Sequence, residues 1–122
     1  MNKESDIIIV VDDDAVIGIS VAEYLQTLNL RIFVFADPRQ VLSFVSGTKH
    51  KIALLIADYN MLGINGEELA EEVKRLIPEI KTILMSGNVD IAESSMFKFD
   101  GFLEKPLFAH KLGEMVKTLL KK

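Results

Sequence analysis

The chain has 122 residues, a formal net charge of −4 and no cysteine, and 49 % of its residues are hydrophobic. This composition suits one compact domain with a buried core, excludes disulfides and thiolate metal sites, and argues against nucleic acid as a direct partner. No apolar run is long enough to cross a bilayer and three acids stop the first such run too early for a signal peptide, so we expect a cytoplasmic protein with no membrane segment.

The first half of the chain alternates between strand-like and helix-like segments. Residues 7–11 are a continuous aliphatic run, which is typical of a strand buried on both faces. Asp37 followed by Pro38 is a favoured helix opening. In chain order we predict a strand at 7–11, a helix at about 15–28, a strand at 30–35, a helix ending at Gly47 with Val41, Leu42 and Val45 inward, and a strand at 52–57.

The second half continues this alternation. Asn65 and Gly66 indicate a turn before a helix, and Pro78 ends that helix. We predict a helix at about 66–77 that buries Leu69, Val73 and Leu76, a strand at 82–85, a short helix near 91–97, a strand at 101–104, and a last helix with Leu112, Val116 and Leu119 inward. Five strands interleaved with helices predict an α/β fold, a doubly wound five-stranded parallel sheet.

Three aspartates lie at the ends of two predicted strands. Asp12 and Asp13 follow the first strand, and Asp58 follows the third. Open parallel sheets bind ligands at the carboxyl ends of their strands, so neighbouring strands would bring these carboxylates together. At an effective dielectric near 20, each close pair of like charges costs roughly 3–4 kcal/mol. The cluster therefore requires a divalent cation, a lysine or a proton, and it predicts a reactive site.

Two further polar residues fall at strand ends. Ser86 follows the fourth strand, and Lys105 follows the fifth. Carboxylates, a hydroxyl and an ammonium together suit phosphoryl transfer, which depends on positioning and electrostatic stabilisation. One carboxylate would attack phosphorus and the others would hold Mg²⁺. The lysine and the hydroxyl would bind phosphoryl oxygens.

Four motifs occur in order along this pattern: Val10–Asp14, Asp58–Met61 with Gly66 downstream, Leu84–Gly87, and Gly101–Pro106. Together they resemble the response-regulator receiver domain of two-component signal transduction, in its single-domain, chemotaxis-regulator-like form. The resemblance covers essentially all of residues 1–122. It implies a three-layer (βα)₅ sandwich with the flavodoxin-like strand order 2-1-3-4-5, and a single receiver domain with no output domain in this chain.

The resemblance implies a role for each residue at the site. Asp58 would be the phosphoacceptor, taking a phosphoryl group from a histidine kinase or a histidine phosphotransfer protein. Asp13, Asp58 and the Asn60 backbone carbonyl would bind Mg²⁺ (or Mn²⁺) directly, while Asp12 would act through a bound water. Asn60 and Asn88 would tune the lifetime of the acyl phosphate. Such a domain catalyses its own phosphorylation and dephosphorylation but is not a conventional turnover enzyme.

The resemblance also implies a conformational switch. Lys105 would pair with a phosphoryl oxygen, next to a cis bond to Pro106. Ser86 would hydrogen-bond the phosphoryl group, and Phe102 would move into the space that Ser86 vacates. The output would be protein–protein interaction with an unidentified downstream target, near Phe102 and the last helix.

The chain departs from the usual receiver pattern at three places. Leu62 stands where receivers usually have proline, which predicts a looser loop after Asp58. Ser86 replaces the commoner threonine and keeps the hydroxyl. The segment 88–100 is shorter than usual, which puts dimerisation through the surface around the fourth helix in question.

Other residues receive structural interpretations. Asp14, rather than Asp12 or Asp13, is expected to cap the first helix. His50 and His110 are expected on the surface. Three aromatic residues are expected in the core or at its margin: Phe97, Phe99 and Phe108.

Two other functions fit parts of the sequence. The segment from Asp12 to Val16 also matches the opening motif of haloacid-dehalogenase-like phosphatases, in which Asp12 would be the nucleophile. That family needs further acids after its lysine, and only Glu114 follows Lys105 here. A docking module that is never phosphorylated is the other alternative, although degenerate receivers usually lose an acid or the lysine. The absence of a Gly-rich phosphate loop argues against nucleotide binding.

Overall fold

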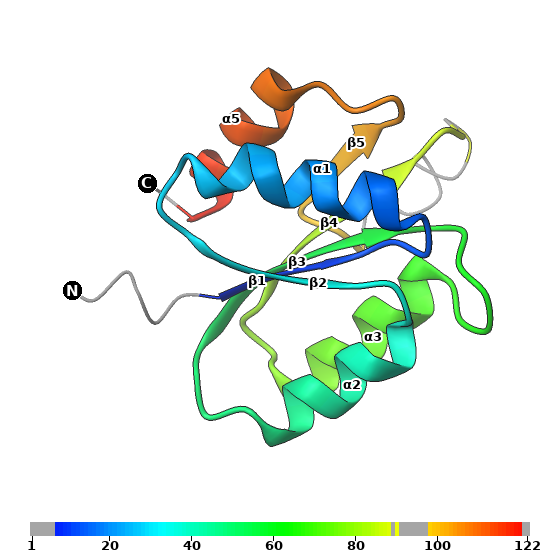
Figure 1. Cartoon of the computed structure of the whole chain (residues 1–122). Coiled ribbons are helices and arrows are strands. Elements are labelled where there is room, and N and C mark those ends of the chain that lie inside the picture. Colours follow the sequence, from blue (N-terminus) through cyan, green and yellow to red (C-terminus); the bar gives the residue numbers. More distant parts are fainter. Residues whose placement is uncertain (1–6, 89, 91–97, 121–122) are drawn as a thin grey trace.

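A computed structural model describes residues 7–88, 90 and 98–120 (Figure 1). Five parallel strands form one sheet in the order β2-β1-β3-β4-β5, which confirms the expected order. The strands are β1 (Ile7–Val11), β2 (Arg31–Phe35), β3 (Ile52–Asp58), β4 (Lys81–Ser86) and β5 (Gly101–Glu104).

Helices cover both faces of this sheet (Figure 1). Those in the described part of the chain are α1 (Ala15–Gln26), α2 (Pro38–Gly47), α3 (Gly66–Leu76) and α5 (Ala109–Leu120). α1 and α5 pack on one face, and α2 and α3 pack on the other. The predicted three-layer sandwich is therefore confirmed. Among the described residues, every helix is too short or too polar to span a bilayer.

β1 lies at the centre of the core because both of its faces are covered. Ile7, Ile9 and Val11 pack in the layer with α2 and α3. Ile8 and Val10 pack in the layer with α1 and α5. All five side chains are fully buried, and each such burial stabilises the fold by about 1.5–3 kcal/mol. This rigid strand supports the residues that follow it.

Two residues that were predicted to be buried are exposed. Leu76 is 51 % exposed and Phe108 is 61 % exposed. Leu76 is the last residue of α3, and the next residue, Ile77, packs against the core in its place. Phe108 precedes the first turn of α5, and its ring lies outside the core beneath the Lys111 ammonium, 6.0 Å away.

The remaining predicted elements differ from the structure mainly at their ends. α1 ends at Gln26, two residues before the predicted end, and β3 extends to Asp58. Phe99 packs at the margin of the core, and the two histidines are exposed, as predicted. Asn65 is the N-cap of α3 and not simply a turn residue. The predicted helix near 91–97, including Phe97, lies outside the described residues.

Candidate functional site

The register of the sheet brings the ends of β1 and β3 side by side. Val11 pairs with Ala57, so Asp12 lies beside Asp58, the last residue of β3. The Asp12 backbone amide donates a hydrogen bond to the Phe35 carbonyl at 3.1 Å. This bond holds the chain in place where it leaves the sheet.

Three carboxylates converge at this edge, as the sequence predicts. Asp12, Asp13 and Asp58 each offer an oxygen, and these atoms lie within 4.8 Å of one another. Asp12 is 1 % exposed and Asp58 is 5 % exposed, whereas Asp13 faces solvent. Two buried acids and one accessible acid therefore form a site that is open on one side.

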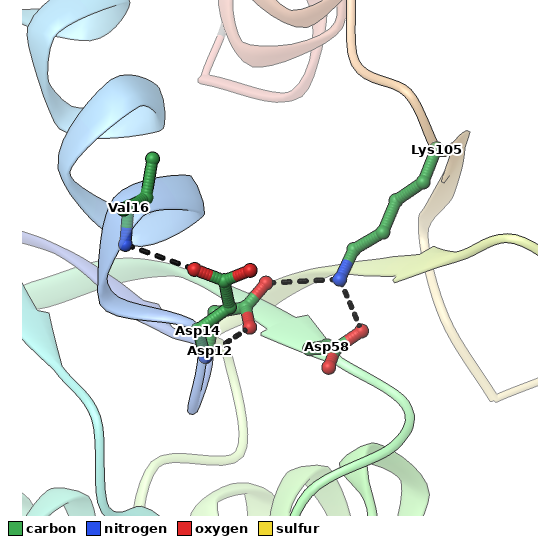
Figure 2. A network of polar contacts seen from close by, with 5 residues as sticks. All are labelled: Asp12, Asp14, Val16, Asp58 and Lys105. Carbon is green, nitrogen blue, oxygen red and sulfur yellow. Dashed lines mark hydrogen bonds and ion pairs between the residues drawn. The ribbon is translucent and has the colours of Figure 1, made fainter.

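Lys105 compensates the buried charge (Figure 2). Its Nζ lies 3.0 Å from Asp12 Oδ2 and 2.8 Å from Asp58 Oδ1. The backbone amide of Lys105 donates to the Ser86 carbonyl at 2.9 Å, which ties the residue after β5 to the end of β4. The bond from Lys105 to Pro106 is cis, as expected.

The environment shifts the proton affinities of both partners. Burial raises the pKa of the Asp58 carboxyl, and repulsion from Asp12 and Asp13 adds to this rise, while the hydrogen bond from Lys105 opposes it. Burial opposes the charge of Lys105, but hydrogen bonds and attraction to Asp58 and Asp12 outweigh it and hold the lysine pKa above its ordinary value. Burial and the neighbouring acids therefore disfavour the charged form of Asp58, although Lys105 forms an ion pair with it.

Asp14 and Asp12 have separate structural roles (Figure 2). Asp14 Oδ1 accepts from the Val16 amide at 3.0 Å and caps α1, as predicted. Asp12 Oδ1 accepts from the Asp14 amide at 2.9 Å, while its other oxygen accepts from Lys105. Asp12 therefore faces the site and Asp14 faces the helix.

The remaining predicted site residues surround this cluster. Ser86 is 2 % exposed at the end of β4, and its hydroxyl accepts from the Asn88 amide at 3.0 Å. Phe102 lies half-buried on β5, where it pairs with Leu84 of β4. Asn60 and Asn88 are exposed in the loops after β3 and β4.

The family comparison decides what kind of domain carries this site. The model of the response regulator receiver domain matches residues 8–117. The chain belongs to the response regulator receiver family. This family accounts for the fold and for the acidic cluster together, and no finding favours the phosphatase or the docking module.

This receiver domain is similar to parts of larger proteins. A protein of Arabidopsis thaliana named as a two-component response regulator, ARR21, is 31 % identical over 114 residues, which cover 93 % of this chain and 19 % of that protein. The sensor kinase CckA of Brucella abortus is 26 % identical over 125 residues, which cover 100 % of this chain and 13 % of the kinase. The chain thus spans less than a fifth of the length of these curated relatives.

Solved structures agree on the fold. A CheY-like response regulator receiver domain protein from Methanospirillum hungatei JF-1 superposes with a TM-score of 0.84 at 24 % identity, covering 95 % of this chain and 94 % of that one. A protein from Neptuniibacter caesariensis superposes with a TM-score of 0.87 at 27 % identity, covering 98 % of this chain and 90 % of that one.

The acidic cluster fits the metal that receiver domains typically bind. Such domains typically hold Mg²⁺ in an acidic pocket, and Asp12, Asp13 and Asp58 form a pocket of this kind. Mg²⁺ prefers oxygen ligands and keeps several waters, and carboxylates also suit Mn²⁺. Asp13 is exposed, so solvent can reach this side of the cluster.

The receiver domain also presents an apolar face on α1 that the periodicity did not predict. Val16 is 72 % exposed, Ile19 is 53 % exposed and Tyr24 is 41 % exposed. A cavity of about 220 Å³ separates α1 from the segment Lys105–Leu107. The sequence does contain the information that could have predicted this face, because these apolar residues lie outside the inward-facing positions of the helix such as Val21.

Proposed function

We propose that Asp58 accepts a phosphoryl group from a phosphohistidine protein and that this domain is a phosphorylation-controlled switch. The observation that carries the proposal is the Asp58 carboxylate, 5 % exposed at a strand end, with one oxygen 2.8 Å from the Lys105 ammonium. Asp12 and Asp13 stand beside it. Repulsion among three close carboxylates opposes folding. A chemical role therefore explains the presence of this cluster better than a structural role does.

In the proposed step, a carboxylate oxygen of Asp58 attacks phosphorus while the bond from phosphorus to the histidine nitrogen breaks. The imidazole leaves and takes up a proton from solvent, and Asp58 becomes an acyl phosphate. Water later attacks this phosphoryl group, which releases inorganic phosphate and restores the carboxylate. The Lys105 ammonium lies 2.8 Å from Oδ1 of Asp58, so it would be close enough to neutralise an oxygen of a phosphoryl group carried by this carboxylate.

The same cluster would hold the metal. Asp13, Asp58 and the backbone carbonyl of Asn60 are proposed as direct ligands, with Asp12 acting through a water. When bound, Mg²⁺ neutralises phosphoryl oxygens during transfer. One carboxylate oxygen from each of Asp12, Asp13 and Asp58 lies within 4.8 Å of the other two. This spacing supports the assignment because a single ion could bind between them.

Ser86 and Phe102 are proposed to transmit the change. The Ser86 hydroxyl accepts from the Asn88 amide, and rotation toward a phosphoryl oxygen would replace this contact with a stronger, charge-assisted hydrogen bond. Phe102, half-buried on the adjacent strand, would then occupy the vacated space. Asn60 and Asn88 are exposed at the rim, where they would tune the access of water and the lifetime of the acyl phosphate.

The proposed phosphodonor is a histidine kinase or a histidine phosphotransfer protein. Val16 and Ile19 are exposed on α1, the helix that follows Asp12 and Asp13, and we expect the donor to contact this helix. A donor with an apolar helix would cover these side chains. The downstream protein target would bind near Phe102 and α5, and we place this exchange in the cytoplasm.

Intact-protein mass spectrometry after incubation with acetyl phosphate tests this function. Wild type is expected to gain one phosphoryl group only when Mg²⁺ is present, and Asp58→Asn is expected to gain none. Asp90→Asn makes the same change at an exposed aspartate and should behave as wild type. Labelling of Asp58→Asn at the wild-type rate would contradict the proposal. If acetyl phosphate labels no variant, failure of beryllofluoride with Mg²⁺ to perturb the wild-type amide spectrum would contradict it.

A further inference from the structure

Gly66 packs directly against the main chain of Asp58. A Cβ atom at position 66 would lie 2.6 Å from the Asp58 carbonyl oxygen and 3.2 Å from its carbonyl carbon. It would also lie 3.0 Å from Cδ1 of Leu84. A side chain such as leucine can rotate away from a new neighbour, but a carbonyl within a strand cannot move without moving the strand. Any larger residue at position 66 therefore displaces Asp58 or the start of α3.

The crowding at Gly66 involves main-chain atoms, whereas the crowding at two other glycines involves only side chains. A Cβ at Gly101 would lie 2.5 Å from Sδ of Met115, and a Cβ at Gly18 would lie 2.9 Å from Cγ1 of Val34. A Cβ at Gly47, Gly87 or Gly113 would have no neighbour within 4 Å. The contact at Gly66 is thus a particular property of the junction between α3 and β3, and it does not follow from glycine content.

Hydrogen bonds prevent this junction from relaxing. The Gly66 amide donates to the Tyr59 carbonyl at 3.0 Å, and the Tyr59 amide donates to the Met85 carbonyl of β4 at 2.9 Å. The loop that connects Asp58 to α3 is therefore anchored at both ends.

The start of α3 is also held by its own cap. Asn65 Oδ1 accepts from the Glu68 amide at 2.9 Å, and Glu68 Oε1 accepts from the Asn65 amide at 3.0 Å. This capping box satisfies the first free amides of the helix. Leu69, which is fully buried, anchors the same turn in the core.

We propose that Gly66 is a positioning residue for the phosphoacceptor. Because it lacks a side chain, the first turn of α3 presses on the Asp58 carbonyl and holds the Asp58 carboxylate toward Lys105 and Asp12. This inference rests on the proposed role of Asp58. It predicts that an added methyl group at position 66 impairs phosphorylation more than it impairs the fold.

The test compares Gly66→Ala with Gly113→Ala, the same change in open space on α5. The readouts are the amide spectrum of the metal-free protein, Mg²⁺ affinity by calorimetry, and the acetyl phosphate concentration dependence of labelling. We expect Gly66→Ala to keep its helical circular dichroism and to label about ten- to a hundredfold more slowly at saturating acetyl phosphate. Its Mg²⁺ affinity should fall, and the amide shifts should centre on Asp58 and Tyr59. Gly113→Ala should match wild type in every readout of the site.

A second substitution separates the two contacts. Leu84→Ala removes the side chain near position 66 and leaves the Asp58 carbonyl in place. The double variant Gly66→Ala/Leu84→Ala should label as slowly as Gly66→Ala. Recovery of the rate would assign the defect to crowding in the core and overturn the proposal.

The possible negative results can be distinguished from one another. Wild-type Mg²⁺ affinity and labelling in Gly66→Ala would overturn this inference while the proposed function stands. A wild type that is neither labelled by acetyl phosphate nor perturbed by beryllofluoride with Mg²⁺ would overturn the proposed function. If Gly66→Ala does not fold, Asn65→Ala loosens the start of α3 without adding an atom. Weaker Mg²⁺ binding and slower labelling in that folded variant would support the proposal, and unchanged values would overturn it.

Discussion

Asp58 occupies an environment that opposes its own charge. Its carboxylate is almost fully buried, and it stands beside two other acids. The pKa of Asp58 is therefore raised above the ordinary value of 3.8, which means that the folded state binds a proton on this group more tightly than the unfolded state does. Protonation of Asp58 therefore favours the folded state at low pH. This contribution to the free energy of unfolding is lost as the pH rises through the folded-state pKa.

Asp58→Asn is accordingly expected to raise the free energy of unfolding at neutral pH. The gain should vanish as the pH falls toward the ordinary value of 3.8. Urea unfolding of wild type and variant across this pH range measures the difference. Asp90→Asn, at an exposed position, should leave stability within about 0.5 kcal/mol of wild type. A destabilised Asp58→Asn at pH 7 would show that the Asp58 charge supports the fold.

Much of the site at the residue scale could be predicted from the sequence. Asp12, Asp58 and Lys105 each follow a strand-like run, and the carboxyl ends of parallel strands share one edge of the sheet. The dense packing around Gly66 could not be predicted, because a close approach between backbones depends on the three-dimensional path of the loop. The sequence motif includes Gly66, but its close approach to the Asp58 carbonyl is visible only in the three-dimensional structure.

Individual helices support the site through their ends. The cap of α1 is Asp14, whose side chain accepts from the Val16 amide, and this cap lies two residues from Asp12. Predicting buried positions from helical spacing succeeded in the middle of helices, as at Val73, and failed at the end of α3, where Leu76 is 51 % exposed. The periodicity cannot show where the sheet stops covering a helix.

The substitution Asp14→Ala tests whether the N-cap of α1 and the phosphorylation of Asp58 are independent. Loss of the cap should cost about 1 kcal/mol of stability, because the Val16 amide loses its partner. Mg²⁺-dependent labelling should be retained, since Asp12 contacts the backbone amide of residue 14 and not its side chain. Chemical unfolding and acetyl phosphate labelling of the same sample measure both effects. Loss of labelling in a folded Asp14→Ala protein would contradict the separate roles of Asp12 and Asp14.

In the whole molecule, the site connects inner strands of the sheet to its edge strand β5. β1 and β3 form the middle of the sheet, and Lys105 links their ends to the segment after β5. A ligand that binds these groups only in the folded state stabilises the entire domain. Strand order and layer arrangement were predictable because alternating strands and helices permit few topologies.

Mg²⁺ is therefore expected to raise the thermal unfolding midpoint of wild type. At a hundredfold excess over the dissociation constant, the gain is about 2.7 kcal/mol. Asp13→Ala removes an accessible carboxylate of the cluster, so the same Mg²⁺ concentration should produce a much smaller rise. Sodium chloride at matched ionic strength is the control for screening. Equal stabilisation of wild type and Asp13→Ala by Mg²⁺ would exclude Asp13 as a ligand.

The central claim is that Asp58 is the residue that carries the phosphoryl group. Reduction of the acyl phosphate with borohydride, followed by peptide mass spectrometry, identifies the modified aspartate directly. We predict that protein treated with acetyl phosphate and Mg²⁺ is reduced at Asp58 and remains unmodified at Asp12 and Asp13. Reduction at Asp12 with Asp58 intact would contradict this account and would favour phosphatase chemistry at the end of β1.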